Sequence, residues 1–569
     1  MLGKRTTQGS LFTPENRLRR KLGEESFYVF LADHRHELFR DEDFATLYCG
    51  DNGRPSVPPS LLACALLLQT FNSVSDQEAT DRAAFDQRWQ FALGIADDEV
   101  PFAKSTLCLF RNQLIIHKEA KLIFHKGIGY LRSKGFAKAH KMTVALDTTP
   151  IFGKGAVQDT FNMLSEGLRQ VLRVVALLQG RTLEELATAE DFSRYVAPSF
   201  KGTWAINWDN EHDRQVVLET LVADCHHVLA LAGKSLSGYT PDSAQAKEIL
   251  QASDLLQKLL VQDVRRSETG AAELIQGVAQ DRIVSVHDPE MRHGRKSSSQ
   301  RFDGYKGALA VETDTQIITA VDVIPGNAHD NVSAPGLIQE TKATTGAQIH
   351  QVIGDGAYGS AEARLDAQQN QYNLVAPVAE SAHTGRFRKE DFAIDLERMC
   401  VTCPAGETTS THYKRRKRTQ RGTVFQHKSF TFSLKQCRDC KLRAQCLMPT
   451  TRQRGVLVHE QEALLQQARD FQRTEQFRAA YHLRVTVEHR IARLMRLGAR
   501  QARYFGSSKV LFQLAMAASV ANLTLFANMG RTSWLFLPML TIWLVLTLDV
   551  ASRIALVEST LPRRATTKP

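Results

Sequence analysis

The chain has 569 residues, 43% hydrophobic and 23% charged, which is typical of soluble globular proteins and excludes a disordered or fibrous chain. A net charge of +11 and a pI near 9.2 favour a polyanionic partner. The start, MLGKRTTQGS, has no apolar segment, so we expect no secretory signal peptide, and nine cysteines, five of them between 400 and 446, argue against a secreted disulfide framework.

The first 140 residues contain no long run of alternating polarity, which favours helices. A helix from Ser60 to Thr70 follows Pro58-Pro59, a favourable helix start, and Ser75 opens a second helix after a tight turn at Asn72-Ser73. Two helices joined in this way fit either a helix-turn-helix that reads DNA or an ordinary helical bundle, and both readings stay open.

Two apolar stretches each lead to an aspartate. The run Thr143–Leu146 predicts a buried strand that ends on Asp147, and the run from Gln351 to Ile353 delivers Asp355 to a glycine-rich turn, where Ser360 can cap the next helix. A carboxylate beside a buried strand is costly unless it meets a cation, a donor or solvent. Taken singly, such an aspartate is most often a turn or cap residue.

Between and after these stretches the sequence predicts more of a sheet. We expect a short strand from Arg282 to Val286, then a hairpin with strands Tyr305–Glu312 and Gln316–Val323. Asp330 is placed to cap a following helix, and Asp288 is interpreted as a turn residue.

After residue 376 the sequence becomes rich in cysteine. Two Cys-x2-Cys pairs have the spacing that tetrahedral zinc needs, and the four ligands are Cys400, Cys403, Cys437 and Cys440. Two alternatives stay open: Cys446 replaces one of the four, or the cysteines are simply buried thiols.

A run of five basic residues lies between the two cysteine pairs, with no acid nearby. Runs of charged residues usually lie at solvated loop tips. On a hairpin of a basic protein, however, contact with DNA phosphates is the better interpretation of this run. The run comprises Lys414, Arg415, Arg416, Lys417 and Arg418.

A helical pattern between Gln476 and Phe505 holds seven arginines and one acid, Glu488. Tyr481, Arg484 and Glu488 are spaced to share one face of that helix, beside an apolar stripe. A lone carboxylate among arginines is usually a solvated ion-pair partner, yet this position suggests the rim of a cleft.

At these residues the sequence resembles a known family. ALDTTPIFGKGAVQDTFN, VIGDGAYG and YHLRVTVEHRIARLMR are similar to the three catalytic blocks of bacterial insertion-sequence DDE transposases. One branch carries a Tyr-x2-Arg-x3-Glu-x6-Lys signature, which Tyr481, Arg484 and Glu488 match, whereas its lysine position is Met495, with Arg496 next to it. The resemblance runs from about residue 10 to about residue 528.

The resemblance implies an α/β protein whose RNase H-like catalytic core is joined to a helical N-terminal domain and two insertions, one helical and one small, cysteine-rich and zinc-ribbon-like. The expected divisions are a DNA-binding domain at 1–140, a core at 141–164, 281–375 and 476–530, a helical insertion at 165–280, a cysteine-rich basic insertion at 376–460 and an apolar tail at 531–569. The tail's 15-residue apolar run is shorter than a usual membrane span, so we expect no membrane association, although a weak anchor stays open.

The implied activity is cut-and-paste transposition, with cleavage at terminal inverted repeats and strand transfer to target DNA. Asp147, Asp355 and Glu488 are then catalytic ligands of Mg²⁺ or Mn²⁺, Arg484 holds a phosphate and Tyr481 positions the strand. The implied partners are double-stranded DNA and further copies of the chain, as a dimer or larger assembly at the bacterial nucleoid in the cytoplasm. Two alternatives are an RNase H-like nuclease without strand transfer and an inactive DNA-binding remnant.

Overall fold

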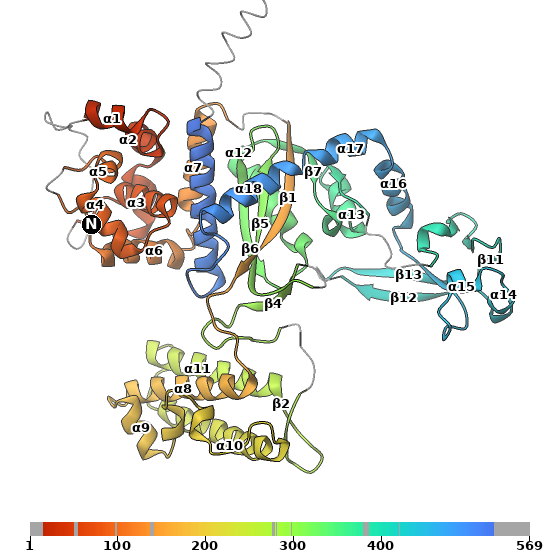
Figure 1. The fold of residues 1–569 in the computed structure, drawn as a ribbon, viewed down its shortest axis with the longest axis horizontal. Helices are drawn as coiled ribbons and strands as arrows, with labels where there is room; N and C mark the ends of the chain where they lie inside the picture. Colours follow the sequence, from red (N-terminus) through yellow and green to blue (C-terminus); the bar gives the residue numbers. More distant parts are fainter. Residues whose placement is uncertain are drawn as a thin grey trace, which may run out of the picture.

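The computed structural model describes residues 15–49, 55–96, 99–136, 141–275, 279, 281–296, 299–378, 386–419 and 422–528. The predicted apolar run of the tail therefore lies outside the described residues. In Figure 1 the helical N-terminal part lies on one side of the central sheet, a hairpin arm projects on the other side, and a separate group of helices lies below the sheet.

The N-terminal part is helical, as the sequence predicts. Its helices are α1 (Glu15–Leu22), α2 (Phe27–Leu38), α3 (Pro59–Asn72), α4 (Asp76–Phe85), α5 (Gln87–Leu93), α6 (Lys104–Ile116) and α7 (Leu122–Ser133), with a 3-10 turn η1 (Asp41–Leu47). The predicted α3–α4 turn is confirmed: Ser73 takes the left-handed conformation with φ 56°, and the Ser75 side chain accepts from the Glu78 N–H.

A partly buried ion pair joins α4 to α6. Arg111, only 6% exposed, donates to both carboxylate oxygens of Asp76, which also accepts from Gln69. Although burial opposes ionisation of Asp76, hydrogen bonds from Arg111 and Gln69 hold its pKa far below the usual range.

Replacing Asp76 with alanine should destabilise the N-terminal part by about 3 kcal/mol, because the Arg111 charge would stay buried without its partner. A depressed carboxylate pKa stabilises the fold above the unfolded pKa of about 4, and this stability is lost as the pH falls below that value. Hydrogen exchange of α3 and α6 in the full chain measures both effects. The double change Asp76→Ala with Arg111→Met should be less destabilising than Asp76→Ala alone, and equal losses would contradict the pairing.

A six-stranded mixed sheet forms the centre of the molecule. Its strands are β1 (Lys141–Phe152), β4 (Arg292–Arg295), β5 (Arg301–Glu312), β6 (Ile318–Pro325), β7 (Gln348–Ile353) and β8 (Asn373–Val375). The order across the sheet is β6-β5-β1-β7-β8, and β4 pairs with the start of β5. The pairs β6–β5 and β5–β1 are antiparallel, whereas β1–β7 and β7–β8 are parallel.

The prediction that β1 ends on Asp147 is wrong, because the strand continues to Phe152. Pairing with β7 stops at Ala145, but pairing with β5 continues to the end of β1. Pro150 lacks an N–H and is tolerated where the strand has a neighbour on one side only. Asp147 therefore lies where β1 separates from β7.

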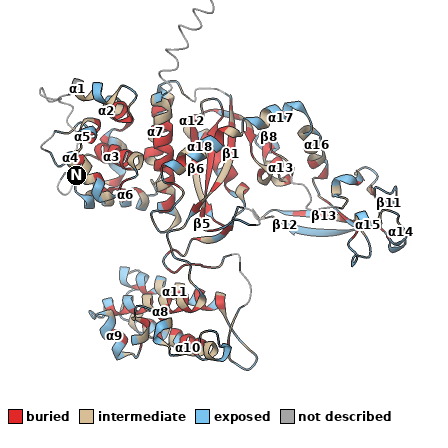
Figure 2. Cartoon of the chain, in the orientation of Figure 1, coloured by how far each residue is buried: buried red, intermediate tan, exposed pale blue. Residues whose placement is uncertain are grey.

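Helices cover both faces of the sheet (Figures 1 and 2). On one face, α12 (Ala334–Thr345) and α13 (Ala361–Gln369) pack with inward residues such as Val144 and Leu146. On the other, α18 (Val485–Arg496) and a helix at Ser507–Asn528 pack with Ala145 and Ile151. Successive strand residues point to opposite faces, so Asp147 lies on the α18 face.

The predicted strand from Arg282 to Val286 is not formed. Its backbone is held instead by two glutamine side chains: Ile283 N–H donates to Gln262 Oε1, and Val286 N–H to Gln158. The next acid, Asp288, is fully buried and accepts from the Tyr305 hydroxyl and the Gly506 N–H. Asp288 therefore links β5 to the start of the helix Ser507–Asn528, a structural role beyond that of the predicted turn residue.

The helical insertion is a small bundle with its own core below the sheet in Figure 1. It contains α8 (Thr160–Leu178), α9 (Leu183–Ala189), α10 (Glu211–Leu236), α11 (Ala244–Asp263) and the short hairpin β2 (Val264–Arg266) and β3 (Ala272–Leu274). The first of these helices begins a few residues before the predicted start at 165, because the Asp159 side chain caps it.

The projecting arm carries the cysteines and ends in the helices that return to the sheet. Its elements are β9 (Ala393–Asp395), β10 (Cys400–Thr402), β11 (Thr408–Thr409), β12 (His412–Arg418), β13 (Val424–Thr431), α14 (Leu434–Arg438), α15 (Arg443–Cys446), β14 (Gly455–Val458), α16 (Glu462–Gln472) and α17 (Glu475–His482). Figure 2 shows β12 as exposed along its length.

Two described helices, Glu211–Leu236 and Ser507–Asn528, are long and apolar enough to cross a membrane by composition alone. In the second, 67% of the apolar window is buried inside the protein, where it packs on the sheet. Residues of the first form part of the insertion core. Both helices thus have partners within the chain.

Candidate active site

Arg484 brings two of the three predicted catalytic acids together. One guanidinium nitrogen donates to Asp147 Oδ2 at 3.0 Å, and another donates to the Glu488 carboxylate. Asp147 is 17% exposed and Glu488 50% exposed, so the pair lies at a surface between β1 and α18. A fork that joins a strand to a helix across 337 residues fixes both carboxylates relative to each other.

The three predicted residues of the last block do not share one continuous helix. The chain leaves α17 after His482, and α18 begins at Val485, with Arg484 at the junction. The Arg484 guanidinium nevertheless lies 5.8 Å from the centre of the Tyr481 ring. Tyr481, Arg484 and Glu488 still lie close together, because each is within one helical turn of the junction between α17 and α18.

The negative charges of Asp355 and of a fourth carboxylate, Asp330, contribute to a raised pKa at Asp147. Burial raises the pKa of Asp147 to about 6, and the negative charges of Asp355 and Asp330 add to this, against the Thr148 N–H and the Arg484 charge. The Asp355 side chain accepts from the Ala357 N–H, as a cap of the turn Gly356–Tyr358.

The prediction that Asp330 caps the following helix is wrong. His329 caps the short turn Asp330–Ser333, and α12 begins only at Ala334. Asp330 instead pairs at 2.7 Å with Lys306 of β5, which is 13% exposed. No local signal marks this residue, because its approach to Asp147 comes from the sheet topology.

Tyr358 adds a polar group beneath the acids. Its side chain is 2% exposed, and its hydroxyl has no hydrogen-bond partner among the described residues. Burial, then the charges of Asp147, Asp330 and Asp355, raise its pKa well above the usual value, so the phenol stays protonated. A Cβ on Gly354 would lie 2.7 Å from this ring, so glycine is needed there.

The chemistry of these side chains fits a hard divalent cation. Four carboxylates, Asp147, Asp330, Asp355 and Glu488, face two cationic side chains, and oxygen ligands are those that Mg²⁺ and Mn²⁺ prefer. No three acidic, histidine or cysteine side chains of the described residues are already arranged to hold a metal ion.

The predicted basic run lies on β12, whose residues are all exposed. β12 pairs in register with β13, so that Lys414 lies opposite Lys428 and Arg416 opposite Gln426. Lys414, Arg415, Arg416, Lys417 and Arg418 lie on this hairpin, whose turn points back toward the sheet (Figure 1), where the Thr423 hydroxyl donates to Glu362 of α13.

The cysteines gather in part. Cys403, Cys437, Cys440 and Cys446 line one small cavity in the arm, whereas Cys400 lies on β10 outside that lining, opposite Asp395. Burial, together with the three neighbouring thiols, raises the pKa of Cys446.

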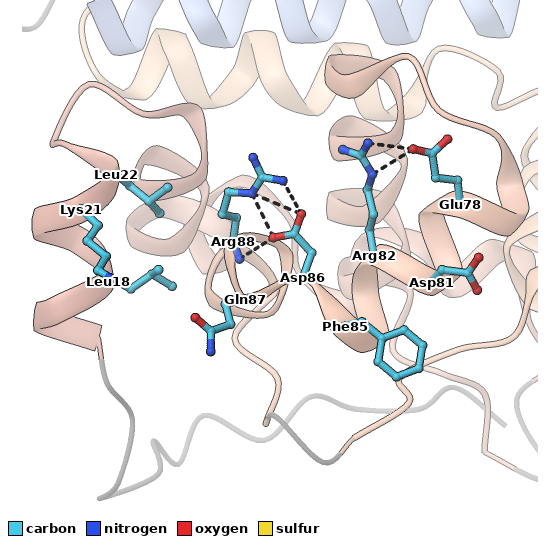
Figure 3. A pocket seen from close by; sticks show the side chains of 10 residues that line it. All are labelled: Leu18, Lys21, Leu22, Glu78, Asp81, Arg82, Phe85, Asp86, Gln87 and Arg88. Atoms are coloured by element: carbon cyan, nitrogen blue, oxygen red, sulfur yellow. Dashed lines mark hydrogen bonds and ion pairs between the residues drawn. The ribbon is translucent and has the colours of Figure 1, made fainter.

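The N-terminal part has a surface hollow of its own, of about 720 Å³, between α1, α4 and α5 (Figure 3). Two of its arginines are neutralised by nearby acids, Arg88 by Asp86 and Arg82 by Glu78. Phe85 is 84% exposed at its edge. These pairs leave the two arginines without free charge for a phosphate, and the helix-turn-helix interpretation of this part stays a prediction.

Two protein-family models match parts of the chain. A family described as a transposase DDE domain matches residues 402–526, and a transposase domain known as DUF772 matches residues 16–113. The first region contains Tyr481, Arg484, Glu488 and the basic hairpin, while Asp147 and Asp355 precede it. A search of curated proteins finds no match. A DDE domain implies a nuclease or transposase activity, and the two matches together support an insertion-sequence DDE transposase.

Proposed function

We propose that the chain cleaves DNA at the terminal inverted repeats of its element and joins the ends to target DNA, with Asp147, Asp355 and Glu488 as catalytic acids. The observation that carries this is the Arg484 bridge between Asp147 and Glu488, with Asp355 within electrostatic reach of Asp147. The sheet supports an RNase H-like core, because its strand order and its two antiparallel and two parallel pairings are those of that fold.

The acids named above are the residues that would hold Mg²⁺ or Mn²⁺. When bound, such ions neutralise charge on the attacking and leaving oxygens of a phosphodiester. Asp147 contributes a carboxylate on a rigid strand and Glu488 one on a helix, so their spacing is set by packing rather than by a loop. Arg484 orients both, and with Tyr481 beside it can contact a phosphate of the strand to be cut.

The remaining surfaces serve binding. The helical N-terminal part would recognise element ends, the basic hairpin β12–β13 would hold phosphates without reading bases, and pairing of two ends would require at least two copies of the chain. The basic net charge and a DNA substrate favour a site of action at the bacterial nucleoid in the cytoplasm. The inactive-remnant alternative rests on Met495 in the lysine position, which packs against the core, and it is weakened by the intact set of acids.

Changing Lys414, Arg415 and Lys417 together to alanine should weaken binding to every duplex alike, because phosphate contacts carry no sequence information. The slope of log affinity against log salt should fall by about one unit per lost contact. Fluorescence anisotropy with cognate and scrambled DNA over a salt series measures both. A loss confined to the cognate end would make the hairpin a sequence reader instead.

The proposed function is tested by incubating the full chain and Mg²⁺ with DNA that carries its flanking inverted repeats, beside the same DNA with scrambled repeats. Cleavage at the repeat boundary only in the first DNA is the expected result. Cutting of both DNAs alike would favour the RNase H-like nuclease alternative.

A further inference from the structure

Four thiols line a single cavity of about 30 Å³ in the arm. Cys403 enters from the turn after β10, Cys437 from α14, and Cys440 and Cys446 from the ends of α14 and α15. The volume is that of one water molecule or one metal ion. The buried apolar side chains of Phe432 and Leu447 complete part of the wall.

We propose that this cavity is a structural zinc site whose ligands are Cys403, Cys437, Cys440 and Cys446, with Cys400 excluded. Four thiolates are the full complement of a closed tetrahedral zinc site. All four cysteines are free of disulfides.

Hydrogen-bond donors around the cavity suit thiolates. The Arg454 N–H donates to Cys437 Sγ at 3.4 Å, and its guanidinium donates to the Cys446 carbonyl oxygen. Arg443 donates to the Cys437 carbonyl oxygen at 3.1 Å, which fixes α14 relative to α15. The sulfur ligands of metal sites are commonly oriented by hydrogen bonds from groups outside the ligand set.

The position of the site gives it a structural task. Cys403 precedes the basic hairpin, and Cys437 follows it directly after β13, so one ion would tie both ends of the hairpin together. The arm needs such a tie because its buried apolar cluster is small, with Phe392, Val401, Phe430 and Val456 among its members. In small modules metal binding supplies much of the folding free energy. This inference does not depend on whether the chain joins DNA.

The test is zinc content of the full, reduced chain by mass spectrometry, in the wild type and in matched serine variants. We expect close to one zinc per chain in the wild type and in Cys400→Ser, and less than a fifth of that in Cys446→Ser. Loss of zinc in Cys400→Ser with retention in Cys446→Ser would overturn the ligand set. A wild type without zinc would overturn the site itself.

A second measurement covers the case in which Cys446→Ser does not fold. Co²⁺ exchanged into the wild type should show the strong sulfur charge-transfer absorption of four thiolates. Cys446→His keeps a zinc ligand, so it should retain metal with a weaker sulfur band. If Cys446 is not a ligand, Cys446→His should leave the four-sulfur band of the bound cobalt unchanged, and that result would overturn the ligand set.

Discussion

Asp147→Asn, Asp355→Asn and Glu488→Gln should each reduce Mg²⁺-dependent nicking of end-bearing DNA by roughly 10³–10⁴-fold. Each change removes one negative charge at nearly constant size, so the fold should survive. Loss of one carboxylate also relieves repulsion among the acids, and the melting temperature should stay equal or rise slightly. Binding to element ends should persist, because it arises from other surfaces. Single-turnover nicking rates, with anisotropy for binding, measure both.

The control for these variants is Glu475→Gln. Glu475 lies on α17, is 81% exposed and pairs only at the surface with Arg478, so nicking should be unchanged. Asp288, a control that the sequence alone would suggest, is unsuitable because it is fully buried and bound to Tyr305. Asp330→Asn tests the fourth acid. If Asp330→Asn abolished nicking while Glu488→Gln cut normally, the third catalytic acid would be Asp330.

Arg484→Gln should lower the nicking rate by about 100-fold, the size expected when a preorganised charged donor is removed from a phosphoryl-transfer site. The variant loses both contacts at once, to Asp147 and to Glu488, and leaves the acids to repel one another. Arg484→Lys keeps the charge without the fork, and its rate should lie between those of the wild type and the glutamine variant.

Arg478→Gln is the matched control for Arg484. Arg478 lies six positions earlier, is 67% exposed and pairs with Glu475. Its nicking rate should match the wild type, with only a small change in DNA affinity. Equal losses in both arginine variants would mean that the effect is general loss of positive charge rather than a role at the acids.

Local features of the fold could be predicted from the sequence because their causes are local. Ser75 and Ser360 cap the helices that follow them, and the hairpin of β5 and β6 turns where its sequence predicts. The extent of β1 could not be predicted in this way. It continues past Asp147 because β5 pairs with it there, and that partner is more than 150 residues away in the chain.

The site was predictable only where its residues carry a motif. Asp147, Asp355 and Glu488 stand in recognisable blocks, and the structure joins the first and last through Arg484. In the sequence, Asp330 is an aspartate beside a turn, a pattern that predicts a helix cap. Only the topology of the sheet brings it near Asp147. Likewise, spacing alone favours Cys400, whereas the short helix α15 turns Cys446 toward the other thiols.

The most direct test of the central claim is a joining assay with a donor that already carries a free 3′-OH at its element end, together with supercoiled target DNA and Mg²⁺. Wild-type chain should join the donor covalently to the target, and Asp147→Asn should bind the same donor without joining it. Joining by Asp147→Asn at the wild-type rate would contradict the assignment of Asp147. Cleavage of intact ends by the wild type without any joined product would contradict the transposase assignment and leave a nuclease.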